Sequence, residues 1–184
     1  MKRQEVAGKN TGNFRFFSPP HDFHLQSNEI CVIMKMNTIS IGVDMEFYTH
    51  SAAETEEAGR AVGQKLAGRR FFLALYGDLG AGKTVFVRGL ASVLSPGSRV
   101  KSPTYTIVNE YRRGPIPLFH FDLYRVTTPD ELDGFGFEEY VENGACVAEW
   151  CEHLGQLLPP GAIRVTIEKC GENDRKITIT EAAS

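Results

Sequence analysis

The sequence predicts an α/β fold, a three-layer α/β/α sandwich with a mostly parallel sheet that closes with a C-terminal antiparallel hairpin. The apolar run 71–76 is continuous, as in strands that are buried on both faces of a parallel sheet. Segments with helical periodicity separate the predicted strands, which is the order expected of layered α/β domains. Residues 163–167 and 176–180 alternate between apolar and polar types, and they predict the hairpin.

Composition limits the class of protein. The chain has 184 residues, with 20 Lys and Arg against 23 Asp and Glu, and its formal net charge is -3. This balance excludes a strongly basic protein that binds nucleic acid through bulk charge alone. No apolar run approaches the roughly 18 residues that a membrane helix needs, and the four cysteines include no C-x-x-C pair. We therefore expect a cytoplasmic protein that has no membrane partner and is monomeric when alone.

The chain divides at about residue 45. Residues 1–44 mix Lys, Asn, Gly and Pro without helical or strand periodicity, which predicts a poorly ordered extension or a start site assigned too far upstream. Short apolar runs at 30–34 and 39–43 leave open whether this part contains a strand. From residue 45 the pattern is regular, and residues 45–184 form the predicted domain.

Local patterns predict each element of this domain. Residues 45–48 indicate a short strand, and Ser51 with Glu54 three residues later indicates a capped helix that ends near Gly68. The later predicted elements are a strand at 71–76, a helix at 85–94, strands at 104–111 and 117–121, a helical stretch from Pro129, a strand at 145–148, and a helix through Leu158. Residues 133–136 are predicted to form a turn, because no apolar strand precedes them.

The segment after the strand at 71–76 matches G-x-x-x-x-G-K-[ST], the pattern of a phosphate-binding loop. It consists of Gly77, Asp78, Leu79, Gly80, Ala81, Gly82, Lys83 and Thr84, and Val85 follows in the helix. The glycines let backbone amides approach phosphate oxygens, and the N-terminus of the helix attracts the same anion. We expect Lys83 to neutralise phosphate charge and the Thr84 hydroxyl to hold Mg²⁺. A purely structural glycine turn is the alternative.

Two acids follow apolar strands and are candidates for organising Mg²⁺ and water. Asp122 and Glu149 end their strands at the edge of the sheet where such folds bind ligands. His120 shares the face of Asp122, either to orient a metal-bound water or as a core histidine. The alternatives are that Asp122 caps a loop and that Glu149 is an exposed acid. Trp150 either packs near the nucleotide or anchors the core.

A loop with a candidate switch residue precedes the strand at 104–111. In many phosphate-loop enzymes a threonine in this place senses the γ-phosphate and Mg²⁺, and Thr104 is the candidate here. The alternative is that its hydroxyl satisfies the turn around Pro103. The sequence has no N-K-x-D pattern for guanine, and this favours ATP over GTP.

Four motifs occur in a fixed order: the loop at 77–84, Val-Lys-Ser-Pro-Thr-Tyr-Thr at 100–106, His-Phe-Asp-Leu-Tyr-Arg at 120–125, and Glu149-Trp150. Over about residues 45–180 the chain resembles the TsaE (formerly YjeE) family, the bacterial ATPases of tRNA threonylcarbamoyladenosine biosynthesis. Together the four motifs are much more specific than the loop alone. Cys151 departs from the family, which more often continues Glu-Trp-Pro.

The resemblance implies a small, degenerate phosphate-loop NTPase that binds ATP and Mg²⁺ and hydrolyses ATP slowly when alone. It also implies two partner proteins, TsaD and TsaB, through which the chain reaches tRNA indirectly. By motif, the implied catalytic residues are Lys83 on phosphate, Glu149 with Thr84 on Mg²⁺, and Asp122 supporting metal and water, while Thr104 and Trp150 match the switch loop and the position beside the acid.

We therefore expect a Mg²⁺-dependent ATPase that assists the TsaD–TsaB complex and resets it between cycles of modifying the adenosine beside the tRNA anticodon. Two other functions remain open. One is a small-molecule kinase, although Arg112 and Arg113 lie in a short turn that makes a poor lid. The other is a nucleotide-gated binding module with negligible turnover.

Overall fold

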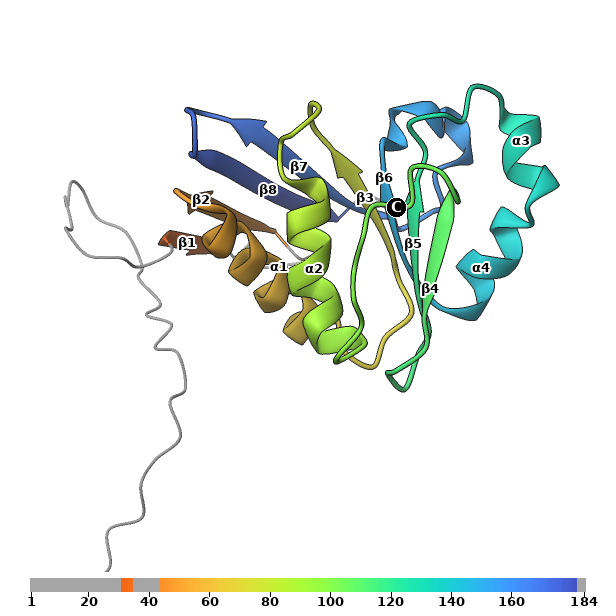
Figure 1. The fold of residues 1–184 in the computed structure, drawn as a ribbon, viewed down its shortest axis with the longest axis horizontal. Coiled ribbons are helices and arrows are strands. Elements are labelled where there is room, and N and C mark those ends of the chain that lie inside the picture. The colour runs from red at the N-terminus through yellow and green to blue at the C-terminus, as the bar shows by residue number, and fades with distance from the viewer. Residues whose placement is uncertain (1–30, 35–43, 182–184) are drawn as a thin grey trace, which may run out of the picture.

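The computed structural model describes residues 31–34 and 44–181. Its elements are, in chain order, β1 (Cys31–Met34), β2 (Met45–Thr49), α1 (Ala52–Leu66), β3 (Phe72–Tyr76), α2 (Lys83–Leu94), β4 (Val108–Tyr111), β5 (Leu118–Asp122), α3 (Pro129–Gly134), α4 (Phe137–Asn143), β6 (Ala145–Glu149), the 3-10 helices η1 (Cys151–His153) and η2 (Gly155–Leu157), β7 (Ile163–Lys169) and β8 (Arg175–Glu181). Figure 1 shows their arrangement. Most predicted strands and helices are present.

The described strands form one sheet with the order β1-β2-β8-β7-β3-β6-β5-β4. Its centre is parallel, because β3 pairs with β7 and β6, and β6 pairs with β5. The outer pairings are antiparallel and include the predicted β7–β8 hairpin. The prediction of a mostly parallel sheet is therefore confirmed only for the four central strands. Short connections join β4 to β5 and β7 to β8, and such connections can join only antiparallel neighbours. Strands β2 and β8 pair although they lie far apart in the chain.

Helices α1 and α2 lie side by side over one face of the sheet (Figure 1). Ser51 caps α1 as predicted, because its hydroxyl oxygen accepts the Glu54 amide at 3.2 Å. The two helices approach very closely: a Cβ added to Gly89 of α2 would lie 1.7 Å from the Glu56 carbonyl oxygen of α1. This contact holds α2, and with it the preceding loop, against the rest of the domain.

The opposite face of the sheet is covered by α3, α4 and the segment after β6. Successive residues of β3 point to opposite faces, so Leu75 belongs to the core under α1 and α2, whereas Phe72 belongs to the second core. There Phe137 of α4 makes edge-on contacts with Phe72 and Phe121, with ring centroids 5.8 and 5.4 Å apart. Helical segments therefore cover both faces.

The strand predicted at 104–111 is wrong in extent, because it begins only at Val108. The residues before it form a turn in which the amides of Thr106 and Ile107 both donate to the Pro103 carbonyl oxygen. Ile107 also has a positive φ of 64°, which is incompatible with a strand. Alternating side chains therefore suggested a strand where the backbone turns.

The helix predicted through residue 158 is also wrong. Two 3-10 segments, η1 and η2, replace it, and the amides of Leu154 and Leu157 bond to carbonyls three residues earlier. Residues 133–136 are only partly the predicted turn, because α3 extends through Gly134 before the link to α4. Short segments with few residues per turn carry weak periodicity, which explains both errors.

Strand β1 lies within the segment 1–44 that we predict to be an extension. It pairs antiparallel with β2, from Cys31 opposite Tyr48 to Met34 opposite Met45. One of the two short apolar runs that the sequence left open thus includes a strand, and the run at 39–43 lies outside the described residues. The division at residue 45 stays a prediction. Within the described ranges, no helix is long and apolar enough to cross a membrane.

Candidate nucleotide-binding site

The predicted phosphate loop joins β3 to α2 at the carboxyl end of the central strand (Figure 1). Gly77, Gly80 and Gly82 have φ values of 139°, 73° and 110°, in a region that side chains disfavour. At Gly77 an added Cβ would also lie 2.4 Å from the Ile167 carbonyl oxygen of β7. Gly82 is the N-cap of α2 and provides no side-chain cap, so the amides of the first helical turn remain available to an anion.

The other loop residues contribute mainly through their backbone. The side chains of Asp78 and Leu79 are exposed, and that of Leu79 is 76% exposed. Ala81 is buried, and its amide donates to the Asp78 carbonyl oxygen at 3.0 Å, which tightens the turn. Val85 follows in the first turn of α2 and is half-buried. These residues shape the loop and present its main chain.

Lys83 is a buried cation, with only 4% of its surface exposed. Its ammonium donates to the carbonyl oxygens of Gly77 and Asp78 at 2.5 and 3.2 Å, and it lies 3.6 Å from the centroid of the Trp150 ring. Burial lowers the pKa of the Lys83 ammonium, and nearby carboxylates, with Glu149 foremost, oppose that shift. A poorly hydrated ammonium in this place is well suited to an anionic ligand.

Glu149 connects the loop to the strands. Its Oε1 accepts the Thr84 hydroxyl at 2.8 Å and contacts His120 Nε2 at 2.9 Å. Since a carboxylate only accepts, Nε2 carries the proton, and the buried Nδ1 of His120 has no partner. The alternative of an exposed Glu149 is wrong, because this residue is 3% exposed. His120 lies at the site, where it orients a carboxylate.

Asp122 lies opposite Glu149 in the paired register of β5 and β6. Its Oδ2 accepts the hydroxyls of Ser102 and Thr104, each at 2.7 Å, and its Oδ1 accepts the Tyr124 amide at 3.1 Å. Asp122 therefore caps a loop, as one alternative held, and also binds the candidate switch residue. The Thr104 hydroxyl donates to Asp122, so a hydrogen bond connects the loop before β4 to the carboxyl end of β5.

Trp150 has a backbone conformation that is rare for a residue with a side chain. Its φ is 65°, at the point where β6 ends and η1 begins. This turn directs the indole over Lys83, and the ring also packs against Tyr124 at a centroid distance of 5.0 Å. The structure therefore brings Trp150 to the loop, although its ring also packs against the second core.

The oxygens near the loop fit a small divalent cation that is shared with phosphate. Mg²⁺ is usually bound through one or two carboxylates together with substrate phosphates and water. Thr84 Oγ1 and Glu149 Oε1 lie together beside the amides of α2, and Asp122 lies on the neighbouring strand. In the described part of the chain, no group of three or more His, Cys, Asp or Glu side chains could hold a metal ion by itself.

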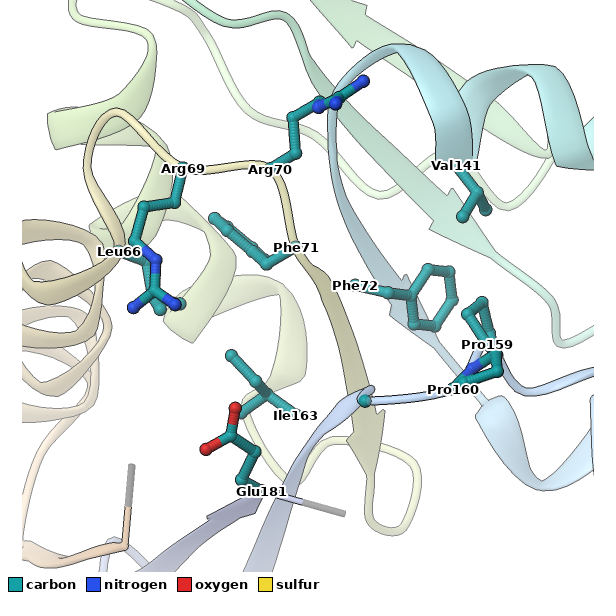
Figure 2. A pocket seen from close by; sticks show the side chains of 11 residues that line it. Leu66, Arg69, Arg70, Phe71, Phe72, Val141, Pro159, Pro160, Ile163 and Glu181 are labelled. Carbon is teal, nitrogen blue, oxygen red and sulfur yellow. The ribbon is translucent and has the colours of Figure 1, made fainter. Parts of the chain in front are cut away.

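A pocket of about 270 Å³ lies at the other end of β3. Figure 2 shows Phe71, Phe72 and Ile163 in its wall, with Glu181 beside Ile163. Phe72 and Ile163 are at the amino ends of the parallel strands β3 and β7, whereas the phosphate loop follows the carboxyl end of β3. The pocket is thus separate from the candidate site.

Comparison with known proteins decides the family. The family model described as "Threonylcarbamoyl adenosine biosynthesis protein TsaE" matches residues 49–177. The chain belongs to the TsaE family. The TsaE match contains every residue of the candidate site, from the phosphate loop to the acids of β5 and β6, and it excludes β1.

Individual TsaE relatives agree with this match. The tRNA threonylcarbamoyladenosine biosynthesis protein TsaE of Bacillus subtilis (strain 168) is 42% identical over 109 residues, covering 59% of this chain and 68% of that protein. The protein of the same name from Nostoc sp. (strain PCC 7120) is 35% identical over 152 residues, covering 80% and 92%. The crystal structure of Bacillus subtilis YdiB has a TM-score of 0.63 at 29% identity, covering 85% and 90%.

Three side chains within the TsaE match contact the site although they are not among its predicted residues. The sequence leaves one of them, Arg175, open as either a solvated charge or a phosphate or partner contact. Ser102 could have been predicted, because it carries a hydroxyl and lies two residues before Thr104 in the motif at 100–106. Lys169 and Arg175 contact carbonyl oxygens of the loop from the β7–β8 hairpin. About 90 residues separate each of these side chains from its partner in the loop, so no local pattern shows that the two meet.

Proposed function

We propose that this chain is a Mg²⁺-dependent ATPase with the P-loop NTPase fold that serves tRNA threonylcarbamoyladenosine biosynthesis. The observation that carries the proposal is the convergence of Lys83, Thr84 and Glu149 at one loop. The Thr84 hydroxyl donates to Glu149 at 2.8 Å, and the Lys83 ammonium lies 3.6 Å from the ring centroid of Trp150, the residue that follows Glu149. The names of the relatives support the pathway, because they are tRNA threonylcarbamoyladenosine biosynthesis proteins.

The proposed chemistry needs little from the protein beyond positioning and charge neutralisation. The amides at the start of α2 and the Lys83 ammonium hold the phosphates, and Lys83 exchanges its present carbonyl partners for phosphate oxygens. Thr84 and Glu149 would hold Mg²⁺, which when bound would screen charge on the transferred phosphoryl group. His120 keeps the Glu149 carboxylate oriented, and Asp122 would support the metal and water.

The proposed output of ATP turnover is conformational. Thr104 is bound to Asp122 in this structure, and a change of its partner to the γ-phosphate or Mg²⁺ would move the loop before β4. We propose that this movement resets a complex of TsaD and TsaB between modification cycles in the cytoplasm, with tRNA bound by the partners. The net charge of -3 agrees with a helper that leaves most tRNA contact to them.

The decisive variant is Lys83→Ala, compared with Lys65→Ala, which removes an exposed lysine from the last turn of α1. We expect ATP affinity to fall at least about tenfold in Lys83→Ala, since a charge-assisted hydrogen bond contributes roughly 1.5–3 kcal/mol. The secondary structure of this variant should be unchanged. Isothermal titration and release of labelled phosphate measure binding and turnover. Full ATPase activity in Lys83→Ala would overturn the proposal.

Two further measurements define the function. Transfer of the γ-phosphoryl group to a small acceptor in place of water would identify a kinase. Reconstitution of tRNA modification with TsaD and TsaB, with and without this chain, tests the pathway: we expect more than one cycle per complex only when the chain and ATP are both present. Equal cycles without the chain would contradict the resetting role.

A further inference from the structure

Two basic side chains of the β7–β8 hairpin contact the phosphate loop. Lys169 and Arg175 stand directly opposite each other at the end of the hairpin, and opposite residues of an antiparallel pair share one face. The Lys169 ammonium donates to the Leu79 carbonyl oxygen at 2.6 Å. Arg175 donates from Nε to the Ala81 carbonyl oxygen at 2.9 Å and from Nη2 to that of Gly80 at 3.5 Å. The three acceptors are consecutive residues of the loop.

The Arg175 guanidinium also holds the turn of its own hairpin. Its Nη1 donates to the carbonyl oxygens of Gly171, Glu172 and Asp174 at 3.3, 3.2 and 2.8 Å. A planar group with five N–H donors in a fixed arrangement can bind the loop and its own hairpin turn at the same time. All of these partners are neutral carbonyls, so none of them cancels the positive charge beside the loop.

Holding these carbonyls has a consequence for the amides that follow them. In a trans peptide the carbonyl of one residue and the amide of the next point in opposite directions. With the Leu79 carbonyl directed to Lys169, the Gly80 amide points away from the hairpin. With the Ala81 carbonyl directed to Arg175, the Gly82 amide does the same. Both glycines have positive φ values and more accessible conformations than other residues, so contacts from outside the loop can help to select one.

We propose that Lys169 and Arg175 are positioning residues that preorganise the phosphate loop for a triphosphate. This inference rests on the proposed nucleotide function and assigns a source to the shape of the loop. The two side chains act through carbonyls on the outer side of the loop, while phosphate binds to amides on the other side. A loop that is competent only part of the time lowers the apparent affinity by that fraction, so ATP binding is affected more than turnover at saturation.

The test compares Arg175→Gln and Lys169→Met with Lys176→Gln, whose lysine neighbours Arg175 on β8 but pairs with Glu46 at 3.2 Å. We expect the Kd for ATP to rise about tenfold in Arg175→Gln and less in Lys169→Met, because competent conformers become rarer. The kcat at saturating ATP should stay within about twofold in both. Arg175→Lys should recover only part of the affinity, and Lys176→Gln should match the wild type. Unchanged ATP affinity in Arg175→Gln would overturn the inference.

A second measurement needs no nucleotide and separates the two proposals. In the free protein, ¹⁵N relaxation gives the order parameters of the Gly80 and Gly82 amides. We expect about 0.85, the value of rigid backbone, in the wild type and less than about 0.6 in Arg175→Gln. Equal order parameters in both proteins would overturn the positioning role. If the wild type failed to bind ATP, the proposed function would fall, while the relaxation result would still decide whether the hairpin orders the loop.

Discussion

Glu149 shows how one side chain connects three segments of the domain. It ends β6, receives the hydroxyl of Thr84 from α2, and is held by His120 from β5. Each partner lies on a different element, so the position of the carboxylate depends on the whole sheet rather than on local sequence. For the proposed Mg²⁺, these oxygens are already ordered and would need little rearrangement when the ion arrives.

Thr84→Val is the residue-scale test of this arrangement. Valine keeps the shape of threonine but removes the hydroxyl that donates to Glu149 at 2.8 Å. We expect Mg²⁺-dependent ATP affinity to fall about tenfold or more, since a hydrogen bond to a charged group contributes roughly 1.5–3 kcal/mol. The matched control is Thr106→Val, whose exposed hydroxyl contacts only Asn109 at 3.2 Å. A Mg²⁺ titration that is identical in Thr84→Val and wild type would contradict the assigned role.

At the scale of elements, the contact between α1 and α2 depends on glycine. A Cβ at Gly89 would lie 1.7 Å from the Glu56 carbonyl oxygen, and one at Gly59 would lie 2.0 Å from that of Phe86. Both contacts involve backbone, which cannot move aside as a flexible side chain can. Because α2 begins at the phosphate loop, the helix pair determines where the loop stands.

Gly89→Ala should therefore separate the two helices and destabilise the domain. We expect the free energy of unfolding to fall by about 3 kcal/mol, at the upper end of the usual cost of overpacking, as measured by urea denaturation. Gly134→Ala is the control, because a Cβ there meets nothing within 4 Å. Alanine is the better helix former, so Gly134→Ala should be neutral or slightly stabilising. Equal stability of the two variants would show that the helices can adjust.

The hairpin turn is linked to the start of α1 by a contact that depends on pH. His50 Nδ1 lies 2.7 Å from Asp174 Oδ1, and this hydrogen bond raises the pKa of His50 above 6.5. The pair therefore contributes its full stability below about pH 6.5, the ordinary pKa of histidine, and loses it as pH rises through the raised value. Asp174→Asn should return the pKa of His50 toward 6.5 in an NMR titration. A pKa that does not move would exclude Asp174 as the cause.

How far the sequence predicts these elements depends on their length. Long apolar or periodic segments such as α1 and β3 were predicted within about one residue of their bounds. The turn before β4 and the 3-10 segments after β6 were not, because alternation over a few residues does not distinguish a turn from a strand. Hydrogen bonds to Pro103 and the positive φ of Ile107, which decide the turn, leave no trace in hydrophobic pattern.

For the molecule as a whole, the topology brings the site together. Placing β3 between β6 and β7 sets Glu149 on one side of the phosphate loop and Lys169 on the other. The sequence predicts Glu149, because an acid that ends a buried strand has a recognisable pattern. It does not predict Lys169, and it leaves Arg175 open as either a solvated charge or a phosphate or partner contact. Charged residues of a hairpin resemble any solvated face until the strand order is known.

The same topology predicts that the N-terminal segment can be removed without loss of the site. Among the described strands, β1 pairs only with β2 at the margin of the sheet, and the phosphate loop follows β3 near its centre. The TsaE match begins at residue 49. A chain that starts at Asp44 should bind ATP within about twofold of the full chain, because affinities of independent sites change little when distant contacts are removed. Its midpoint of thermal unfolding should fall slightly, since deletion leaves one edge of β2 unpaired. Loss of ATP binding in the shortened chain, with its secondary structure intact, would show that residues before Asp44 belong to the functional domain and that the division at residue 45 is wrong.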